Sequence, residues 1–477
     1  MTNSSFDAIV VGSGPNGLAA AITIQQSGLS VLVIEAKDTI GGGLRSAELT
    51  LPNFVHDICS AIHPLAAGSP FFKILPLNQH GLKFIQPTIH AAHPFDDGTA
   101  AALYSSVEET ANRLHEDEIS YIKLIQPLVS NWPQIVDDAL GPLHFPKHPI
   151  NMARFGLKAL RSAKHLSKHF RSKHARGLWA GMSAHSILPL SKVTTSAIGL
   201  VLMTAAHMYG WPIPKGGSAA IANALASYFV SIGGTIQTNF YVNSLDQLPS
   251  SRAIIFDLSP KQLIEIAGHK FSSFYKWQLK RYRYGSGVFK IDWALNEPIP
   301  FISTECRQAG TIHLGNTFEE IEASEQMVAQ GKHPEKPFVL LAQQSLFDPS
   351  RAPIRKHTAW AYCHVPNGST LDMTERIENQ VERFAPGFRD CILAKHVMNC
   401  EQLQEYNQNY IGGDINGGMI DMSQLFTRPA LRLSPYRTSA KGIYICSAST
   451  PPGGGVHGIC GYHAAKRALR DIFKIKV

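Results

Sequence analysis

Short apolar runs and turn residues alternate near the N-terminus of the chain. Residues 8–11 are continuously apolar, which is typical of a strand buried on both faces of a parallel sheet. Helix-forming residues follow over 18–26, and Gly28 supplies a helix stop. A second apolar run, residues 31–34, ends at Glu35. The pattern predicts a strand–helix–strand unit of an α/β fold.

A later segment, residues 288–295, alternates strictly between apolar and other side chains. Phe289, Ile291, Trp293 and Leu295 share one face of the predicted strand. Lys290 and Asp292 lie on the other face. The alternation predicts a half-buried strand with an ion pair between these two side chains.

Residues 357–365 show the same alternation, with a bulky face opposite a face of small residues. The bulky face consists of Trp360, Tyr362 and His364. A packed aromatic core is the favoured interpretation of this face. The wall of an apolar substrate tunnel is the alternative.

The turn after the first strand reads Gly12-Ser13-Gly14-Pro15-Asn16-Gly17, a G-x-G-x-x-G motif. Gly12 allows a tight turn, Gly14 lets the backbone approach a pyrophosphate, and Gly17 permits close packing of helix on strand. The following helix N-terminus offers free N–H groups to phosphates. Glu35 is placed to accept hydrogen bonds from a ribose hydroxyl. Because strand, turn, helix, strand and acid occur in order, the segment predicts a dinucleotide site.

Two further segments favour FAD over NAD. In residues 38–46, backbone amides around Gly42 and Gly43 are expected to approach the far phosphate or the ribityl chain, with Arg45 as counter-charge. In residues 442–458, a strand enters a turn rich in proline and glycine, and a helix leaves it. The N-terminus of that helix can stabilise negative charge on a reduced flavin.

These motifs together resemble the phytoene desaturase-like FAD-dependent oxidoreductases, and most closely the branch of pyridine nucleotide-disulphide oxidoreductase domain-containing protein 2. The likeness extends over nearly the whole chain. Besides the glycine motifs it includes residues 40–64, 210–218, 284–295, 360–369 and 409–418. The chain differs from carotenoid desaturases at Ser447 and Ser449, where those enzymes carry glycine.

The resemblance implies an α/β fold with a Rossmann-type FAD-binding domain (glutathione reductase-like, of the amine oxidase and phytoene desaturase type), a mixed-sheet substrate domain and a helical insertion. It implies a discontinuous FAD domain, in which a strand leading to Val242 returns to the cofactor. The predicted domains are 1–75 with 211–275 and 405–477 (FAD), 76–110 with 276–404 (substrate), and 111–210 (helical and basic). The residues expected to contact FAD are Gly12, Ser13, Gly14, Pro15, Asn16, Gly17, Glu35, Ala36, Gly42, Gly43, Leu44, Arg45, Val242, Ser447, Ala448, Gly455 and Val456.

Three side chains are candidates for a catalytic role. His63, His185 and His457 lie in segments that are expected to approach the flavin, although a single histidine is more often structural, and of these His63 and His457 are the catalytic candidates. Lys290 is the third candidate, because amine oxidase-like flavoproteins place a lysine near the flavin. The sequence offers no His/Cys cluster with zinc spacing, so no metal site is predicted.

Charge is distributed unevenly along the chain, whose net charge is +8. No acidic residue occurs between Asp138 and Asp246, whereas this stretch holds eleven lysines and arginines, which leaves the rest of the chain at −3 (8 minus 11). Residues 149–176 predict one or two basic helices with an apolar stripe at Leu160, Ala163, Leu166 and Phe170. A solvated helix is the simplest interpretation. Peripheral contact with anionic lipid and docking of an acidic partner are the alternatives.

Seven cysteines without short spacings indicate a reducing compartment and buried thiols. No cysteine pair suits a flavin disulfide reductase, and no second nucleotide unit suits NAD(P). We therefore expect a cytoplasmic FAD-dependent oxidoreductase, peripheral to a membrane in one alternative, that binds no nucleic acid. The expected reaction transfers hydride between an apolar, lipid- or isoprenoid-like substrate and flavin N5. The alternatives are an FAD-dependent isomerase and a membrane-associated or assembly protein with a vestigial flavin site.

Overall fold

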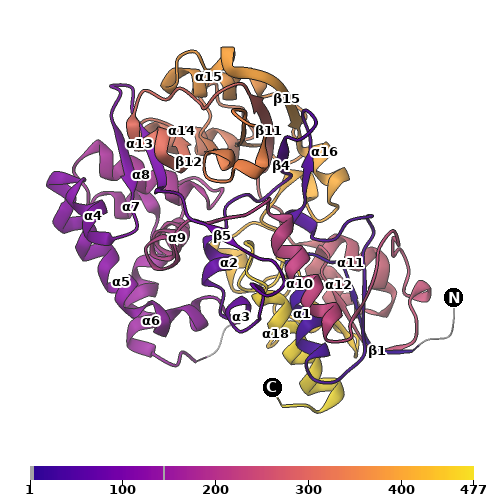
Figure 1. Ribbon diagram of the computed structural model, residues 1–477. Helices are drawn as coiled ribbons and strands as arrows, with labels where there is room; N and C mark the ends of the chain where they lie inside the picture. Colours follow the sequence, from indigo (N-terminus) through magenta and orange to yellow (C-terminus); the bar gives the residue numbers. More distant parts are fainter. Residues whose placement is uncertain (1–4, 143–144, 477) are drawn as a thin grey trace.

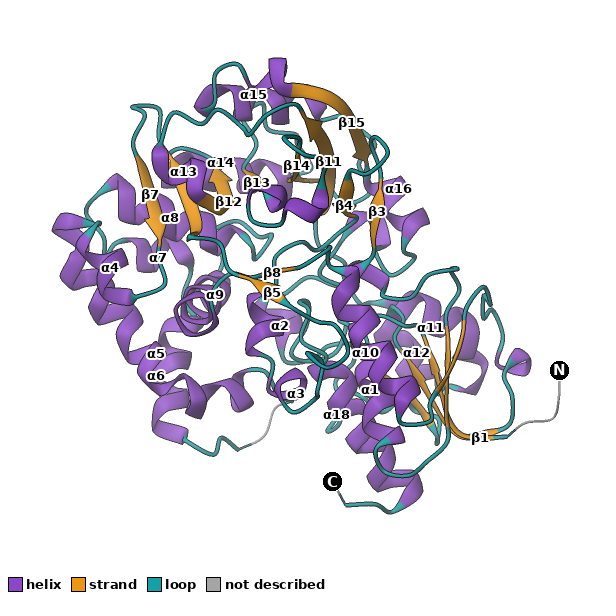
Figure 2. Ribbon diagram, viewed as in Figure 1, coloured by secondary structure: helices purple, strands orange, loops and turns teal. Residues whose placement is uncertain are grey.

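A five-stranded parallel sheet brings together distant parts of the sequence (Figures 1 and 2). The computed structural model describes residues 5–142 and 145–476. The strand order is β16 (Ile443–Ile445), β10 (Ser251–Phe256), β1 (Phe6–Val11), β2 (Val31–Ile34) and β9 (Thr235–Gln237). The predicted strand–helix–strand unit is confirmed, with α1 spanning Pro15–Gln25.

Helices cover both faces of this sheet, which explains the continuous apolar runs of its strands. Ala8 and Val10 pack against α1, α10 (Ala219–Ser231) and α18 (Ile459–Ala468). Ile9 and Val11 point to the other face, against α11 (Pro260–Ala267) and α12 (Ser273–Lys280). The strand predicted to lead to Val242 is shorter than expected, because β9 ends at Gln237 and irregular backbone continues from there.

The second sheet has seven strands in mixed orientation, with a single parallel pairing among them, β12 with β6. Its strand order is β15 (Ile392–Met398), β11 (Gly287–Leu295), β14 (His357–Val365), β13 (Val339–Ala342), β12 (Ala309–Leu314), β6 (Ile89–Pro94) and β7 (Ala100–Leu103). Both strands predicted from strict alternation, β11 and β14, are present. The expected half-burial of residues 288–295 was wrong, because β11 is buried along its whole length and both of its faces are covered. Two small two-stranded sheets, β3 (Ser46–Glu48) with β4 (Val55–Asp57) and β5 (Phe84–Ile85) with β8 (Ile213–Pro214), connect the larger ones.

The two faces of the mixed sheet have different covers. Phe289, Ile291 and Trp293 lie on the face packed by α13 (Thr304–Gln308) and α15 (Thr374–Phe384). Trp360 and Tyr362 lie on the opposite face, which is packed by α14 (Phe318–Ala329) and by the helical part of the chain. As predicted, Lys290 pairs with Asp292, and this buried ion pair lies on that second face. The shorter helices elsewhere are α2 (Pro64–Gly68), α3 (Pro70–Lys73), α16 (Cys400–Tyr406) and α17 (Met422–Leu425).

The helices of residues 107–209 form a helical lobe that packs beside the mixed sheet (Figure 1). Its helices are α4 (Val107–Asn112), α5 (Glu118–Ala139), α6 (Pro149–Ala159), α7 (Ala163–Ser167), α8 (Lys173–Ala184) and α9 (Thr195–Tyr209). The prediction of one or two helices over 149–176 was wrong, because three helices occupy this stretch. The predicted apolar stripe is broken at Leu160, which is the C-cap residue just after α6 and is 41% exposed.

Acidic side chains from other elements neutralise part of the basic stretch. Lys164 lies 3.0 Å from Glu322, and Arg176 pairs with Glu319 of the same helix α14. Lys173 pairs with Asp97. These charges therefore help to hold the helical lobe on the mixed sheet, and a contact of 149–176 with a membrane surface stays a prediction. Among residues 5–142 and 145–476, no helix is both long and apolar enough to cross a bilayer. All seven cysteines are buried, as expected.

Candidate functional site

One cavity of about 470 Å³ lies between the two large sheets. At one end it is lined by the turn between β1 and α1, by the tip of β2 and by the end of β10. At the other end it is lined by side chains of the mixed sheet and of the helical lobe. The cavity therefore joins the predicted dinucleotide site to the predicted substrate side of the molecule.

The first turn is compact because its glycines leave no room for side chains. Gly12 has a φ of +102°, a backbone conformation that favours glycine. A Cβ on Gly17 would overlap the carbonyl oxygen of Gly12, so the first turn of α1 can pack on Gly12 only if residue 17 has no side chain. The side chain of Asn16 lines the cavity, and its Oδ1 atom is buried without a partner among the described residues. The N-terminus of α1 thus opens onto the cavity.

The carboxylate of Glu35 is bound by three neighbouring residues. Its Oε2 atom accepts hydrogen bonds from the N–H (3.1 Å) and the hydroxyl (2.5 Å) of Ser13. Its Oε1 atom accepts from Arg45 (3.0 Å) and from the backbone N–H of Lys37 (3.0 Å). A ribose hydroxyl would therefore replace one of these donors. Arg45 also donates to the carbonyls of Thr39 and Gly42, so it stabilises its own loop while it lines the cavity. Its role as counter-charge for a phosphate stays a prediction.

Sequence reasoning missed a second carboxylate at this end of the cavity, that of Asp257. It follows β10 as Glu35 follows β2, and this shared pattern of an apolar run ending in an acid was the signal available. Its Oδ2 atom accepts a hydrogen bond from the N–H of Gly17 at 2.9 Å, and a Cβ on Gly14 would lie 2.6 Å from the same oxygen. Burial raises the pKa of Asp257 to about 7; the Gly17 N–H opposes this shift and the charge of Glu35 adds to it.

The raised pKa of Asp257 predicts a pH-dependent stability that Asp257→Asn should remove. A raised native pKa means that the proton-linked stabilisation is complete below pH 3.8 and is lost as the pH rises to about 7. At about 1.4 kcal/mol per pKa unit, the variant should gain up to roughly 4 kcal/mol over the wild type across this range. Urea unfolding at pH 5, 6, 7 and 8 measures the difference. A constant difference across these pH values would contradict the assignment.

The second glycine segment lies directly against the first turn. Gly42 has a φ of +56°, and a Cβ on it would lie 3.2 Å from the Cα of Gly14. A Cβ on Gly43 would overlap the hydroxyl of Tyr410, and Tyr406 donates a hydrogen bond to the carbonyl of Gly42 at 2.9 Å. These tyrosines line the cavity from a segment far along the chain and were not predicted. The glycines at 42 and 43 are therefore required by contacts that local sequence does not reveal.

The C-terminal turn closes the cavity from another side. Ser447, Ala448, Gly455 and Val456 line it, between β16 and α18. The buried side chain of Arg428 donates a hydrogen bond to the carbonyl of Ala448 at 2.7 Å. Of all the residues predicted to contact the cofactor, only Gly17 is outside the described residues that line the cavity. The structure thus brings the predicted set together, and its contact with a cofactor stays a prediction.

The three catalytic candidates have different positions. His63 lines the cavity, whereas His457 and Lys290 are not among the described residues that line it. The Ser218 hydroxyl donates to the carbonyl of Ser60 (2.6 Å), so it accepts a hydrogen bond from His63 Nε2 (2.8 Å). Burial lowers the pKa of His63 to about 4, so the ring is neutral at physiological pH.

His457 is bound within the C-terminal turn. Its Nδ1 atom accepts a hydrogen bond from the N–H of Ile459 at 3.0 Å, at the start of α18. Burial lowers the pKa of His457 to about 4. The side chain of Lys290 is buried and pairs with Asp292. Both side chains have structural partners, and any catalytic role for them stays a prediction.

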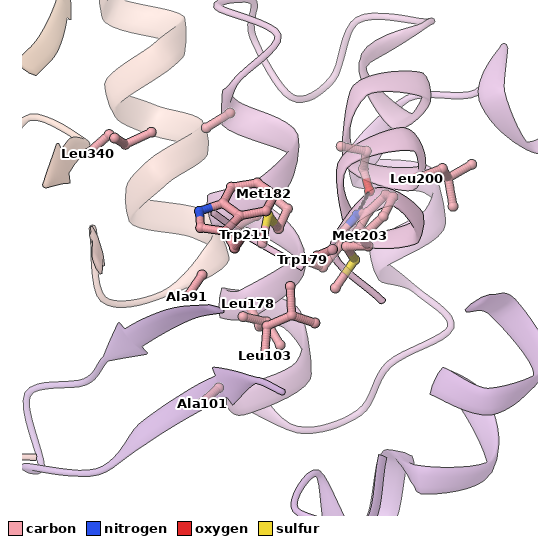
Figure 3. Packing of buried hydrophobic residues seen from close by; sticks show 14 of the residues in the cluster. Ala91, Ala101, Leu103, Leu178, Trp179, Met182, Leu200, Met203, Trp211 and Leu340 are labelled. Carbon is pink, nitrogen blue, oxygen red and sulfur yellow. Dashed lines mark hydrogen bonds between the residues drawn. The ribbon is translucent and has the colours of Figure 1, made fainter. Parts of the chain in front are cut away.

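The far end of the cavity is an aromatic chamber. Its walls include Trp211, Leu340 and Leu202, with Trp360 and Tyr362 from the bulky face of β14. Figure 3 shows Trp211 and Leu340 among the side chains packed with helices α8 and α9. The bulky face is thus part of the packed core, as favoured for residues 357–365, and it also lines the cavity. Its role as the wall of a substrate tunnel stays a prediction. His364, the third member, binds Glu325 at 2.9 Å and is not among the described lining residues.

In the part of the chain that the structure describes, no three His, Cys, Asp or Glu side chains are arranged to hold a metal ion. The lining residues give the cavity a glycine-lined end, suited to a nucleotide, and an apolar end, suited to an organic molecule.

Comparison with known protein families identifies the N-terminal unit. Residues 10–75 match the family described as NAD(P)-binding Rossmann-like domain. This segment contains the first turn, Glu35 and the second glycine segment. The nucleotide-binding character of the glycine-lined end is thus supported by a family match as well as by geometry.

Three curated relatives align with almost the whole chain. The pyridine nucleotide-disulfide oxidoreductase domain-containing protein 2 of Rattus norvegicus is 25% identical over 98% of this chain and 94% of its own. A limonene dehydrogenase component from Castellaniella defragrans is 20% identical over 98% of this chain and 95% of its own. The lycopene-forming phytoene desaturase of Pseudescherichia vulneris is 22% identical over 97% of this chain and 98% of its own. The predicted resemblance to phytoene desaturase-like oxidoreductases is confirmed.

Solved structures share the fold. An oxidoreductase from Methanosarcina mazei superposes with a TM-score of 0.67 at 15% identity, covering 97% of this chain and 100% of the other. A putrescine oxidase bound to putrescine superposes with a TM-score of 0.62 at 15% identity, covering 99% and 100%. The predicted fold class is therefore confirmed as a Rossmann-type unit joined to a mixed sheet, the architecture of these oxidoreductases.

Proposed function

We propose that this chain is an FAD-dependent oxidoreductase that acts on a C–H bond of an apolar, isoprenoid-like substrate. The observation that supports it most is the single cavity that runs from the glycine-lined turn at α1 to the aromatic chamber. A cofactor held at the first end and a substrate held at the second would meet inside one cavity. The relatives named for limonene and phytoene, both isoprenoid hydrocarbons, agree with such a substrate.

The residues present fit FAD. The free N–H groups at the start of α1 suit the pyrophosphate, and Asn16 has a buried oxygen without a partner among the described residues. Gly42 lies against Gly14, so one molecule can contact both glycine segments. Ser447 and Val456 would contact the flavin end from the C-terminal turn. FAD, when bound, would supply N5 as the hydride acceptor or donor.

The protein's own contribution is orientation and the exclusion of water. Apolar surface at the substrate end comes from Trp211, Trp360 and Tyr362. These three side chains are buried in the core. The neutral ring of His63 lies along the same cavity and adds no charge to it. An apolar molecule would enter this chamber because burial of its surface is favourable, and the chamber would hold its C–H bond within reach of the cofactor.

We expect the purified protein to be yellow and to release FAD on denaturation. Flavin absorbance and chromatography of the released cofactor measure this, and addition of FAD to apoprotein should quench flavin fluorescence. A colourless protein that binds no added FAD would contradict the proposal. Anaerobic incubation with isoprenoid hydrocarbons should bleach the flavin band. Product without bleaching would indicate isomerisation instead, and bound FAD without any turnover would favour a structural role.

A further inference from the structure

The aromatic chamber contains a polar atom that the fold does not use. His185 follows α8 and lines the cavity, and it keeps partial exposure in a stretch, 181–190, that is otherwise buried. The Nδ1 atom of His185 has no hydrogen-bond partner among the described residues. Unlike Nδ1 of His313, it is not sealed from the cavity. This ring therefore presents one free nitrogen to whatever occupies the chamber.

The orientation of the His185 ring is set by its neighbours. Its Nε2 atom lies 3.0 Å from Nε2 of His313. The imidazole ring packs edge-on against the ring of Trp211, with ring centroids 6.3 Å apart. His313 is fully buried and packs closely on Gly181, where an added Cβ would lie 2.6 Å from its Nδ1 atom. The imidazole of His185 is thus held between a buried histidine and a buried tryptophan, with Nδ1 on its free side.

The shared hydrogen bond fixes which nitrogen of His185 carries a proton. Two neutral imidazoles joined through Nε2 share one hydrogen between them. Nδ1 of His313 is buried without a partner among the described residues, and a buried orphan N–H is rarer than a buried orphan acceptor. His313 therefore carries its hydrogen on Nε2 and donates it to His185. This leaves His185 protonated on Nδ1, the atom open to the chamber.

Both rings remain neutral at physiological pH. Burial lowers the pKa of His185 to about 3, and burial also lowers the pKa of His313 far below its usual value. A second donor lies in the same chamber, since the hydroxyl of Tyr362 has no hydrogen-bond partner among the described residues. Burial raises the pKa of Tyr362, so this phenol keeps its hydrogen. The chamber thus offers neutral donors and no charge.

We propose that His185 Nδ1–H is a specificity-determining donor, and that the chamber takes an apolar molecule bearing one hydrogen-bond-accepting oxygen. A carbonyl, ether or hydroxyl oxygen would satisfy it. A pure hydrocarbon would leave the N–H buried and unpaired, which costs free energy. The inference rests on the proposed function, because it assigns the substrate end of the same cavity.

Limonene and carvone form a matched probe pair, because they share one carbon skeleton and carvone adds a carbonyl. Headspace gas chromatography over solutions of the full-length, cofactor-loaded protein measures the binding of each without relying on turnover. The wild type should bind carvone about tenfold more tightly than limonene, the ratio expected for one good hydrogen bond. In His185→Phe the ratio should fall to about one, with the affinity for limonene retained. In Tyr362→Phe, the matched variant that deletes one hydroxyl, part of the preference should remain.

Three results would overturn the inference. One is equal binding of carvone and limonene by the wild type, and another is an unchanged preference in His185→Phe. The third needs no variant: a structure of the wild type with carvone whose oxygen lies away from His185 Nδ1. In all three the apolar chamber of the proposed function stands, since at least one apolar probe still binds. Failure of both probes to bind would remove the apolar chamber along with the inference, whereas the flavin content tests the cofactor separately.

Discussion

Replacing Gly461 with alanine is expected to separate two helices and to abolish cofactor binding. Gly461 lies in α18, where it crosses α1 so closely that a Cβ would overlap the carbonyl oxygen of Asn16. It would also lie 2.7 Å from the carbonyl carbon of Asn16 and 2.9 Å from the N–H nitrogen of Ala20. These are backbone atoms of α1, so relief requires movement of the whole helix. We expect a loss of about 3 kcal/mol or more in the free energy of unfolding.

Cofactor binding should suffer with stability, because Asn16 lies in the turn at the glycine-lined end of the cavity. Urea unfolding and FAD content of the purified variant measure the two effects. Gly156→Ala is the matched control, since this glycine is also helical (α6) and a Cβ there would meet nothing within 4 Å. The control should be neutral or stabilised by up to about 1 kcal/mol. Equal behaviour of the two variants would disprove the close crossing of α1 and α18.

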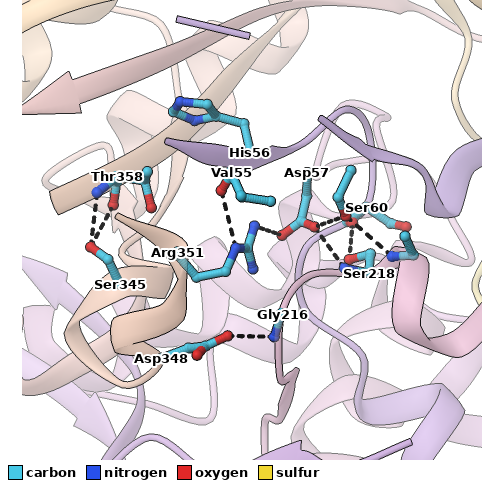
Figure 4. Close-up of polar contacts among 12 residues, drawn as sticks. Val55, His56, Asp57, Ser60, Gly216, Ser218, Ser345, Asp348, Arg351 and Thr358 are labelled. Atoms are coloured by element: carbon cyan, nitrogen blue, oxygen red, sulfur yellow. Dashed lines mark hydrogen bonds and ion pairs between the residues drawn. The ribbon is translucent and has the colours of Figure 1, made fainter. Parts of the chain in front are cut away.

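Arg351→Leu should destabilise the protein by about 3–5 kcal/mol, because it leaves a buried carboxylate unpaired. Arg351 and Asp57 are both fully buried, and their side chains lie 2.8 Å apart (Figure 4). Arg351 also donates to the carbonyl of Val55 at 3.0 Å. Asp57 accepts from the N–H of Ser218 at 2.7 Å, so the ion pair connects β4, the segment before α10 and the mixed-sheet side of the molecule.

The pH dependence of this variant should have the opposite sign to that of the wild type. Burial tends to raise the pKa of Asp57, but Arg351 and the hydrogen bonds to Asp57 more than offset it, so the native pKa lies below 3.8. In the wild type this stabilisation is present above pH 3.8 and is lost as the pH falls through the native pKa. Without Arg351 burial raises the pKa, so stability should fall as the pH rises above 3.8.

Two variants make the Arg351 test specific. Asp57→Asn combined with Arg351→Leu removes both charges and should recover a large part of the loss. Arg176→Leu breaks the pair with Glu319, whose side chain is 62% exposed, and should cost less than about 1 kcal/mol. Urea unfolding between pH 5 and 8 compares all three. A double variant as unstable as Arg351→Leu would mean that lost packing, and not the unpaired charge, causes the effect.

The features that were predicted correctly depend on residues close together in the chain. The apolar run 8–11, the glycines of the first turn and the alternation of 288–295 each describe a local backbone geometry, and each was found as expected. The glycine-rich segments also met at one cavity, because parallel strands end at the same edge of a sheet. The misjudged helices over 149–176 show the limit of local pattern, since Leu160 fits a helical stripe but is the C-cap residue just after α6.

Other features follow from contacts between residues that are distant in sequence. Asp257 meets Gly17 across 240 positions, and His185 meets His313 across 128. The ion pair of Arg45 with Glu35 was not predicted, because it forms only when the loop after β2 is folded. Local propensity and periodicity thus specified the glycine turn after β1 and several strands, among them β1, β2, β11 and β14. The pairing of buried polar groups, and with it the chemistry of the chamber, arose only in the folded chain, because burial makes most polar atoms take partners wherever packing brings one within reach.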